Sequence, residues 1–373
     1  MKRKIRMGMV GGGPGAFIGD VHRMAARLDG MIELVCGAFS SHPDKNRAAG
    51  NSLFLPESRC YDTFEEMFEK EKSLPEGERM DFVSITTPNH LHAPIALKAL
   101  QNGFHVVCEK PMTLTVEEAE ALAAEVERSG LLFCLTHNYT AYPMIRTAGQ
   151  MIRAGELGSI RRIMVEYPQG WLADAVTPDN IQGSWRTNPV TSGVSCCMGD
   201  IGSHSENLAE FITGLKISEL CANIKSFVPG RLLDDDGDVL LKFDNGAIGS
   251  LSASQIAVGE ENALKIRVYG TKAAIEWNQQ TPESLVIKYN DRPMQIMRRN
   301  WAGAGSRWSR LPAGHPEGFI EAFGNLYRDM ALAIDARMQG VEYKTEFPTV
   351  HDGLRGVRFI HAVVASKGQW IKL

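Results

Sequence analysis

Between residues 5 and 138 the sequence changes repeatedly from short apolar runs to amphipathic stretches, and few architectures accommodate that pattern. The apolar runs predict strands over 5–10, 32–39, 81–87, 104–110 and 131–138. Helical stretches are predicted between them, up to Leu28 and over 64–70, 92–103 and 115–130. Strands that alternate with helices pair in parallel and are covered on both faces, so this part predicts an α/β domain built on a parallel sheet.

The turn after the first predicted strand is rich in glycine and reads GGGPGA over residues 11–16. The spacing Gly11-x-Gly13-x-x-Ala16, between a first strand and a first helix, fits the dinucleotide-binding fingerprint of Rossmann domains. Glycine permits the tight turn and lets backbone N–H groups at the helix N-terminus approach a pyrophosphate. A longer turn that ends at Ile18-Gly19 fits the same role. The candidate cofactor-binding residues of the turn are Gly11, Gly13, Gly15, Ala16, Phe17 and Ile18.

The end of the second predicted strand bears on the choice of dinucleotide. An NAD site usually has an acidic residue there, which holds the 2′-hydroxyl of the ribose. This chain has Ser40 and Ser41 instead, and a serine accommodates either a hydroxyl or a 2′-phosphate. Lys45 and Arg47 follow closely and can supply positive charge. The sequence therefore predicts NAD or NADP without choosing between them.

A lysine stands at the end of the fourth predicted strand, in VVCEKPMTL (106–114). The ammonium group of Lys110 loses solvation beside an apolar strand, so it should be either paired with an acid or used in chemistry.

From about residue 145 a different pattern begins. Strands are predicted over 159–170, 218–228, 238–258, 263–278 and 284–290, with hairpin turns at DNG (244–246) and YGTKAA (269–274). Helices are predicted to flank them over 144–154, 203–213 and 317–338, followed by a last helix near 350–366. We therefore expect a Rossmann domain at 1–143 and an α+β domain at 144–373 with a large, mostly antiparallel open sheet. The last helix is a candidate to return to the first domain.

One polar stretch of the second half, SGVSCCMGDIGSHSENLAEF (192–211), places Asp200 and His204 four residues apart. If both are helical, the carboxylate and the imidazole share one face. Alternatively, Ser203 and Glu206 form a capping box, the helix begins there, and Asp200 lies in the preceding turn. A third interpretation gives Asp200 a turn-capping role and leaves His204 as an ordinary surface residue. Spacing alone does not decide among the three.

Composition excludes several classes of function. The 373 residues include 40 basic and 44 acidic side chains, mixed along the chain, which does not favour a nucleic-acid surface. The sequence lacks an apolar run near the roughly 20 residues that cross a bilayer, and its basic N-terminus leads into a predicted strand rather than a signal-peptide cleavage site. Seven cysteines without a Cys-x-x-Cys pair predict buried thiols in a reducing cytoplasm. Metal-binding and nucleophile-elbow motifs are absent from the sequence, so we expect no catalytic metal.

Four segments occur in a specific order: VGGGPGA (10–16), TTPNHLHAPIALKAL (86–100), CEKPMTLTVEEA (108–119) and GDIGSH (199–204). Together they resemble the glucose-fructose oxidoreductase/inositol dehydrogenase/rhizopine-catabolism (Gfo/Idh/MocA) family of NAD(P)-dependent oxidoreductases, over essentially the whole chain. The chain departs from the family pattern in a glycine turn about three residues longer, and in the missing acid after the second strand. These departures bear on the choice of cofactor.

The resemblance implies roles for particular residues. Lys110, in the family's Glu-Lys-Pro motif, would hydrogen-bond the substrate oxygen, and His204, oriented by Asp200, would be the base. Glu109 and Pro111 would fix where the ammonium points. Further cofactor contacts are expected from Thr87, Asn89, His92, Glu109 and Lys110.

Five more polar or aromatic residues are candidates by their place in the chain. Asn138 ends the fifth predicted strand and Tyr139 follows it, and the carboxyl ends of strands face ligands in such sheets. Asn138 is expected to contact the cofactor, and Tyr139 is expected to contact the substrate. Trp185 and Arg186 precede the histidine segment and would wall the nicotinamide pocket. His315 opens a predicted helix and would reach substrate hydroxyls. The irregular piece at 290–316 is expected to be a lid or a partner arm.

The combined expectation is a dehydrogenase that moves a hydride between NAD(P) and a secondary hydroxyl of a sugar, glycoside or cyclitol. An NAD-dependent glycosidase with transient redox chemistry needs the same lysine and histidine and stays open as an alternative. A non-catalytic NAD(P)-binding sensor is the third possibility. By the resemblance, a homodimer or homotetramer through the C-terminal sheet is expected, since alternate positions of strands 239–257 and 264–277 are apolar.

Overall fold

The computed structural model describes residues 1–177 and 179–373, which form two compact units. The first contains residues 1–138 and 319–354, and the second contains residues 139–318 and 355–373. The chain thus leaves the first unit at Asn138, close to the predicted division at 143/144. Helix α10 (Phe319–Gln339), which the sequence places beside the second sheet, belongs instead to the first unit and packs on its helix α1. The last helix, α11 (Val350–Ser366), begins in the first unit and ends in the second.

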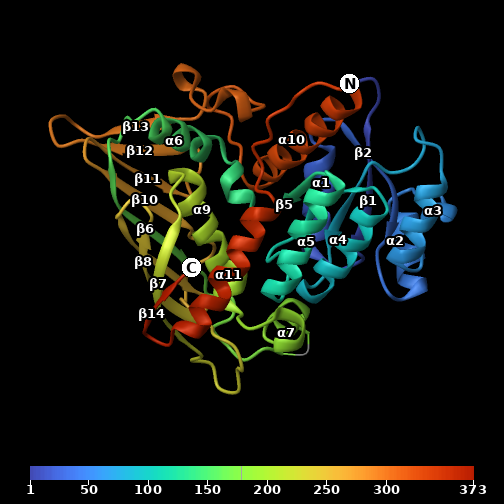
Figure 1. Cartoon of the computed structure of the whole chain (residues 1–373), viewed down its shortest axis with the longest axis horizontal. Helices are drawn as coiled ribbons and strands as arrows, with labels where there is room; N and C mark the ends of the chain where they lie inside the picture. The colour runs from blue at the N-terminus through green and yellow to red at the C-terminus, as the bar shows by residue number, and fades with distance from the viewer. Residues whose placement is uncertain (178) are drawn as a thin grey trace. The chain divides into compact units, whose positions relative to one another are not determined.

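The first unit is built on a five-stranded, entirely parallel sheet, as predicted (Figure 1). Its strands are β1 (Ile5–Gly11), β2 (Ile32–Ala38), β3 (Phe82–Thr86), β4 (His105–Cys108) and β5 (Phe133–Leu135). Their order is β2-β1-β3-β4-β5, so β2 lies on one side of β1 and the later strands lie on the other. The topological switch point is therefore between β1 and β3. Ligands of open parallel sheets bind at the carboxyl ends of the strands at such a switch point.

Helices cover both faces of this sheet, which explains why the central strand β3 is buried along its whole length. The helices are α1 (Phe17–Arg27), α2 (Pro43–Ser52), α3 (Phe64–Ser73), α4 (His92–Gln101), α5 (Val116–Ser129) and α10. The predicted capping box of α5 is confirmed, since Thr115 and Glu118 bond each other's backbone N–H groups and Gly130 ends the helix at φ 66°. Helix α2 was not predicted, because its ten residues carry few apolar side chains.

The second unit contains a nine-stranded sheet of order β13-β12-β11-β10-β6-β9-β8-β7-β14. The strands are β6 (Ile160–Pro168), β7 (Ile217–Lys225), β8 (Asp236–Phe243), β9 (Ile248–Ser254), β10 (Lys265–Gly270), β11 (Ala274–Asn278), β12 (Ser284–Lys288), β13 (Gln295–Arg298) and β14 (Trp370–Lys372). β6 and β9 are parallel, and the other paired neighbours are antiparallel. The predicted mostly antiparallel sheet is confirmed.

One face of this sheet is covered by α6 (Pro143–Arg153) and α9 (Ser203–Thr213). The alternate apolar positions that the sequence would leave bare, such as Leu241, Val268 and Trp277, are buried inside the unit. The argument from bare apolar strands to an oligomer surface is therefore wrong, because those side chains belong to the core. The opposite face carries ion pairs, including Glu276 between Lys265 and Lys288.

The 290–316 segment is anchored to its own unit rather than extended as an arm. It contains β13 and two short turns, η5 (Trp301–Gly303) and η6 (Ser306–Trp308). Trp308 is buried and lies against the guanidinium of Arg146, and buried Arg299 pairs with Glu283 and Glu317. An open groove of about 950 Å³ separates η5 from α6. Among residues 1–177 and 179–373, no helix has both the length and the apolarity to cross a membrane.

Candidate functional site

The glycine turn of the first unit follows the longer of the two frames considered from sequence. β1 ends at Gly11 and α1 begins only at Phe17. A Cβ atom on Gly19 would lie 2.4 Å from the Cα of Gly12, so strand and helix pack at a distance that only glycine allows. The role of the fingerprint's third small residue therefore belongs to Gly19 rather than to Ala16.

The same turn fits a dinucleotide pyrophosphate. Gly11 and Gly12 have φ of 84° and 71°, in the left-handed region that favours glycine. A Cβ on Gly11 would meet the backbone of Thr86 at 3.0 Å. Next to this turn the buried hydroxyl of Thr87 lacks a hydrogen-bond partner among the residues that the structure describes. A buried hydroxyl without a partner is costly and indicates a missing polar ligand.

The residues expected at the adenosine ribose lie beside the turn. A Cβ on Gly13 would meet the Phe39 carbonyl oxygen at 2.7 Å and the Ser40 Cβ at 3.8 Å. The Ser40 hydroxyl accepts the backbone N–H of His42, and Ser41 is exposed. Arg47, a candidate for a 2′-phosphate, pairs with Asp44 at 2.6 Å.

Lys110 lies two residues beyond the end of β4 and is half-buried. Its backbone N–H donates to the carboxylate of the neighbouring Glu109 at 3.3 Å, and the Lys110–Pro111 peptide is cis. Burial alone would raise the pKa of Glu109, but the hydrogen bond and charge of His22 and the charge of Lys110 outweigh it and lower the pKa to about 2. Glu109 is therefore a buried anion beside the candidate catalytic lysine.

His92 does not have the cofactor-contacting geometry expected from sequence. It is buried, and its Nε2 and Nδ1 lie 2.9 Å and 2.8 Å from the carbonyl oxygens of Thr87 and Pro111. Burial lowers its pKa, which favours the neutral ring. A neutral ring has one N–H, so His92 donates to only one of these two carbonyl oxygens. Asn89 is also buried, in the short helix η2 (Asn89–Leu91).

In the second unit the helix that carries His204, α9, begins at Ser203 and is preceded by a π-helical turn. A π-helical turn, η4 (Met198–Gly202), runs directly into α9, and Asp200 lies in that turn. The Ser203 hydroxyl donates to the Gly199 carbonyl at 2.7 Å and so does not cap the helix. The capping box itself is therefore absent, although α9 begins at Ser203 and Asp200 lies in the preceding turn, as that interpretation expects. π turns inside helices are frequent at functional sites.

The buried carboxylate of Asp234 holds the segment of chain that leads into this turn. Asp234 accepts the backbone N–H groups of Cys196 and Met198 at 3.0 Å and 2.9 Å, and the Ser195 hydroxyl at 3.0 Å. Burial nevertheless raises the pKa of Asp234. Three hydrogen bonds to the Asp234 carboxylate fix the backbone up to Met198, two residues before Asp200.

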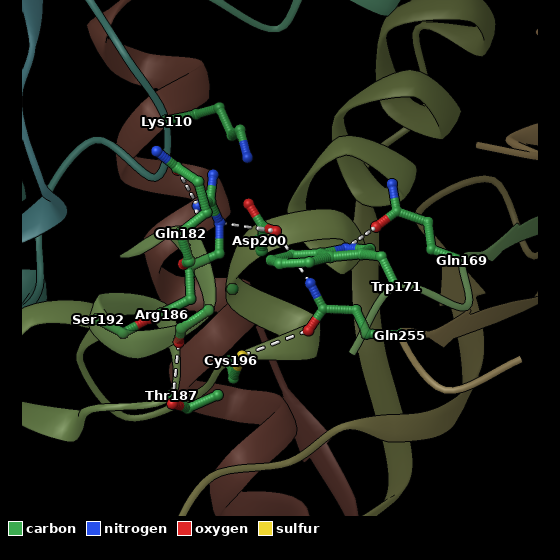
Figure 2. Close-up of polar contacts among 12 residues, drawn as sticks. Lys110, Gln169, Trp171, Gln182, Arg186, Thr187, Ser192, Cys196, Asp200 and Gln255 are labelled. Atoms are coloured by element: carbon green, nitrogen blue, oxygen red, sulfur yellow. Dashed lines mark hydrogen bonds and ion pairs between the residues drawn. The ribbon is translucent and has the colours of Figure 1, made fainter. Parts of the chain in front are cut away.

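Asp200 is the centre of a polar cluster, drawn in Figure 2. Its carboxylate lies 3.3 Å from Nε of Arg186 and accepts Nε2 of Gln255 at 2.9 Å. Gln255 is fully buried, and its other amide atom accepts the Cys196 thiol at 3.3 Å. The guanidinium of Arg186 lies over the rings of Trp185 and Trp171, 4.2 Å and 5.7 Å from their centroids.

His204 is buried with aromatic rings at its side. It meets Tyr139 edge-on, with ring centroids 4.8 Å apart. The Tyr139 hydroxyl bonds Tyr167 at 2.6 Å and accepts the Asn262 amide at 2.9 Å. Tyr139 and His204, two of the predicted substrate residues, are therefore brought together.

A relay of amides joins this pair to the cluster on Asp200. Asn262 accepts Nε2 of Gln169 at 2.7 Å, and Gln169 accepts the Trp171 indole N–H at 2.9 Å. Sequence reasoning missed Tyr167, Gln169, Trp171, Gln255 and Asn262. One signal was available, since Tyr167, Gln169 and Trp171 recur every second residue, as side chains on one face of an extended chain do.

His315 and Asn138, two further predicted residues, take no part in the contacts described above. His315 is exposed, and its backbone carbonyl accepts from Arg299. Asn138 is buried at the last residue of the first unit.

Comparisons with known proteins agree with both units. Residues 5–137 match the model of the oxidoreductase family with an NAD-binding Rossmann fold, and residues 145–276 match that of the GFO/IDH/MocA C-terminal domain. The uncharacterized oxidoreductase YfiI of Bacillus subtilis is 32% identical over 100% of this chain and 98% of its own. Levoglucosan dehydrogenase of Pseudarthrobacter phenanthrenivorans is 28% identical over 99% and 98%.

Solved structures agree as well. An inositol dehydrogenase homolog from Azotobacter vinelandii, complexed with NAD⁺, has a TM-score of 0.94 at 34% identity and covers 100% of this chain and 98% of its own. The same homolog has been solved with NADH and myo-inositol, with a TM-score of 0.91.

Proposed function

This chain belongs to the Gfo/Idh/MocA family of NAD-binding oxidoreductases, and from that premise we propose that it oxidises a secondary hydroxyl of a sugar, glycoside or cyclitol. The relatives named above include a levoglucosan dehydrogenase and an inositol dehydrogenase homolog solved with myo-inositol. Their substrates share a ring with several hydroxyl groups, which is the chemical class proposed for this chain.

The observation that carries the proposal is the aromatic-walled polar cluster on Asp200. A polyol offers donors and acceptors around its rim and C–H groups on its faces. Asp200, Arg186 and Gln255 supply a carboxylate, a guanidinium and an amide, while Trp171 supplies an apolar face. These three groups already bond one another, and their remaining donor and acceptor capacity suits a polyol better than an apolar alcohol.

Residues of the first unit are proposed to hold the dinucleotide. Gly11, Gly12 and Gly13 shape the turn for the pyrophosphate, Thr87 offers its buried hydroxyl, and Ser40 lies where the adenosine ribose is expected. When bound, the nicotinamide accepts the hydride that leaves the substrate carbon. The inositol dehydrogenase homolog solved with NAD⁺ and with NADH supports NAD over NADP.

Oxidation also requires that the hydroxyl proton be removed. We assign this step to His204 and the stabilisation of the developing alkoxide to the Lys110 ammonium. Asp200 would keep its carboxylate in place through Arg186 and Gln255. In this assignment His204 takes the proton at a ring nitrogen while the edge of Tyr139 fixes the ring plane.

A coupled screen tests the proposal. Inositols, free sugars and glycosides are offered with NAD and with NADP, and both reduced cofactor and sugar product are measured. One equivalent of NADH for each ketosugar formed supports it. Hydrolysis of a glycoside without net NADH indicates the glycosidase alternative. Cofactor binding without turnover of any polyol indicates the sensor and contradicts the proposal.

Assembly and location complete the proposal. We propose that the ion-paired face of the second sheet, which also exposes Leu240 and Ile248, pairs with further copies of the chain as a dimer or tetramer. A reducing cytoplasmic location is supported by seven cysteines that form no disulfide, five of them buried. Light scattering at micromolar concentration tests the assembly, and a monomer contradicts it.

A further inference from the structure

Next to Glu109, the residue before Lys110, the first unit contains a line of buried polar side chains that the proposed reaction does not use. Ser84 of β3, Tyr327 of α10, His22 of α1 and Glu109 after β4 come from four different elements, and all are at most 8% exposed. Apolar packing would fill this space at lower cost, because each buried polar group needs its own partner.

The distances join these residues into one chain of hydrogen bonds. The Ser84 hydroxyl lies 2.8 Å from the Tyr327 hydroxyl, and that hydroxyl lies 2.6 Å from Nδ1 of His22. On the other side of the ring, Nε2 of His22 lies 3.0 Å from the Glu109 carboxylate. The Thr136 hydroxyl, from the end of β5, donates to the same carboxylate oxygen.

Hydrogen-bond capacity fixes the end of the chain at Glu109. This carboxylate is an anion and only accepts, so Nε2 of His22 carries a proton. Burial raises the pKa of Tyr327, which therefore keeps its phenol proton. The negative charge stays on Glu109, whose second oxygen accepts the N–H of Lys110.

We propose that Tyr327 and His22 are positioning residues for Lys110, acting through the Glu109 carboxylate that they hold in place. The inference rests on the proposed function in one respect, namely that Lys110 is the group that stabilises the substrate oxygen. Tyr327 lies 218 residues beyond Glu109 in the sequence and reaches it only because α10 packs on α1. Helix α10 therefore supplies one of the residues that position Lys110.

The first experiment needs no substrate. The rate at which Lys110 is acetylated at pH 8 is measured by peptide mass spectrometry in the full-length protein. Glu109→Gln should raise this rate about fivefold, because Lys110 loses the carboxylate that fixes its backbone and its amine becomes more accessible. Tyr327→Phe, which keeps the ring and removes the hydroxyl, should raise it about threefold.

A matched control separates positioning from stability. Tyr343→Phe removes a phenol hydroxyl that bonds Asp329 of α10 at 2.7 Å, in the same unit. Both tyrosine variants lose the hydrogen bonds of a phenol hydroxyl and should lower the thermal midpoint. Only Tyr327→Phe should change the labelling of Lys110. On the best polyol it should also lower kcat about tenfold, with KM and the dissociation constant for NAD unchanged within about twofold.

The double variant tests whether the effect passes through Glu109. In a Glu109→Gln background, Tyr327→Phe should have almost no further effect on labelling or kcat. Full additivity, or labelling in Tyr327→Phe equal to that in Tyr343→Phe, overturns the inference. If Tyr327→Phe does not fold, Ser84→Ala removes the hydroxyl that bonds Tyr327 and should show a smaller change of the same sign; no change overturns the inference. If no polyol is oxidised but the labelling order holds, the proposed function fails and the positioning of Lys110 stands.

Discussion

The Nε of Arg186 lies 3.3 Å from the Asp200 carboxylate, while its guanidinium lies over the ring of Trp185 at 4.2 Å. The ion pair and the indole hold the guanidinium from two directions. Arg186 comes from helix α7 (Ile181–Arg186) and Asp200 from the π turn η4, so the contact joins two segments that separate turns of the chain have brought together.

Arg186→Met should lower kcat/KM for the best polyol by about 10²-fold, because Asp200 loses its charged partner and the substrate loses a donor. A charge-assisted hydrogen bond of about 1.5–3 kcal/mol accounts for that factor. Steady-state kinetics measure it. The control is Arg292→Met, since Arg292 is exposed and stacks on Tyr289 at 3.7 Å in the same unit. Equal losses in both variants would contradict a role for Arg186 in the site.

Lys110→Met keeps the side-chain volume and removes the ammonium group. We expect turnover to fall by about 10²–10³, the usual cost of one charge-stabilising donor. NAD should still bind within about threefold of wild type by fluorescence titration. Lys98→Met on α4 serves as the control, because Lys98 is half-buried and lies outside the proposed site. Wild-type turnover in Lys110→Met would make this lysine structural.

His204→Asn should lower turnover by about 10²–10⁴ and flatten the acid limb of the pH–rate profile, since that limb reports protonation of the base. Asp200→Asn should give a smaller loss and a shifted limb, because it loosens the site without deleting the imidazole. The measurement is kcat/KM from pH 5 to 9. An acid limb that survives unchanged in His204→Asn would assign the base to another residue.

Gly13→Ala should weaken NAD binding at least about tenfold. The added Cβ would lie 2.7 Å from the Phe39 carbonyl oxygen, so the turn or the end of β2 must move. Gly77→Ala is the matched control, since a Cβ there meets nothing within 4 Å. Isothermal titration with NAD compares the two. Tight binding by Gly13→Ala would mean that the turn does not hold the pyrophosphate.

The buried charge of Glu109 predicts how stability depends on pH. Its pKa falls from 4.5 to about 2 on folding, so the ionised form stabilises the native state by about 3 kcal/mol above pH 4.5. That contribution should disappear as the pH falls from about 4.5 toward about 2. Urea midpoints at pH 6 and pH 3 measure it. Glu109→Gln should show a shallower loss over this interval, and identical slopes would contradict the assignment.

Several features of the molecule could be predicted from the sequence because their signals are local. The apolar runs that became β1 to β5, the glycine turn after Val10 and the capping box at Thr115 each depend on residues close together in the chain. The period of such a pattern reports which face of an element is buried. The same kind of pattern also predicted the second, mostly antiparallel sheet. It did not predict that α10 belongs to the first unit.

The sequence by itself thus determined the two-sheet architecture, the glycine turn and the segments that carry Lys110, Asp200 and His204. Only the tertiary structure decided their partners. Gln255 reaches Asp200 across 55 residues, Tyr139 meets Asn262 across 123, and His22 meets Tyr327 across 305. The physical reason is that periodicity encodes burial within one element, whereas a polar contact between distant elements depends on how their packed faces bring single side chains together.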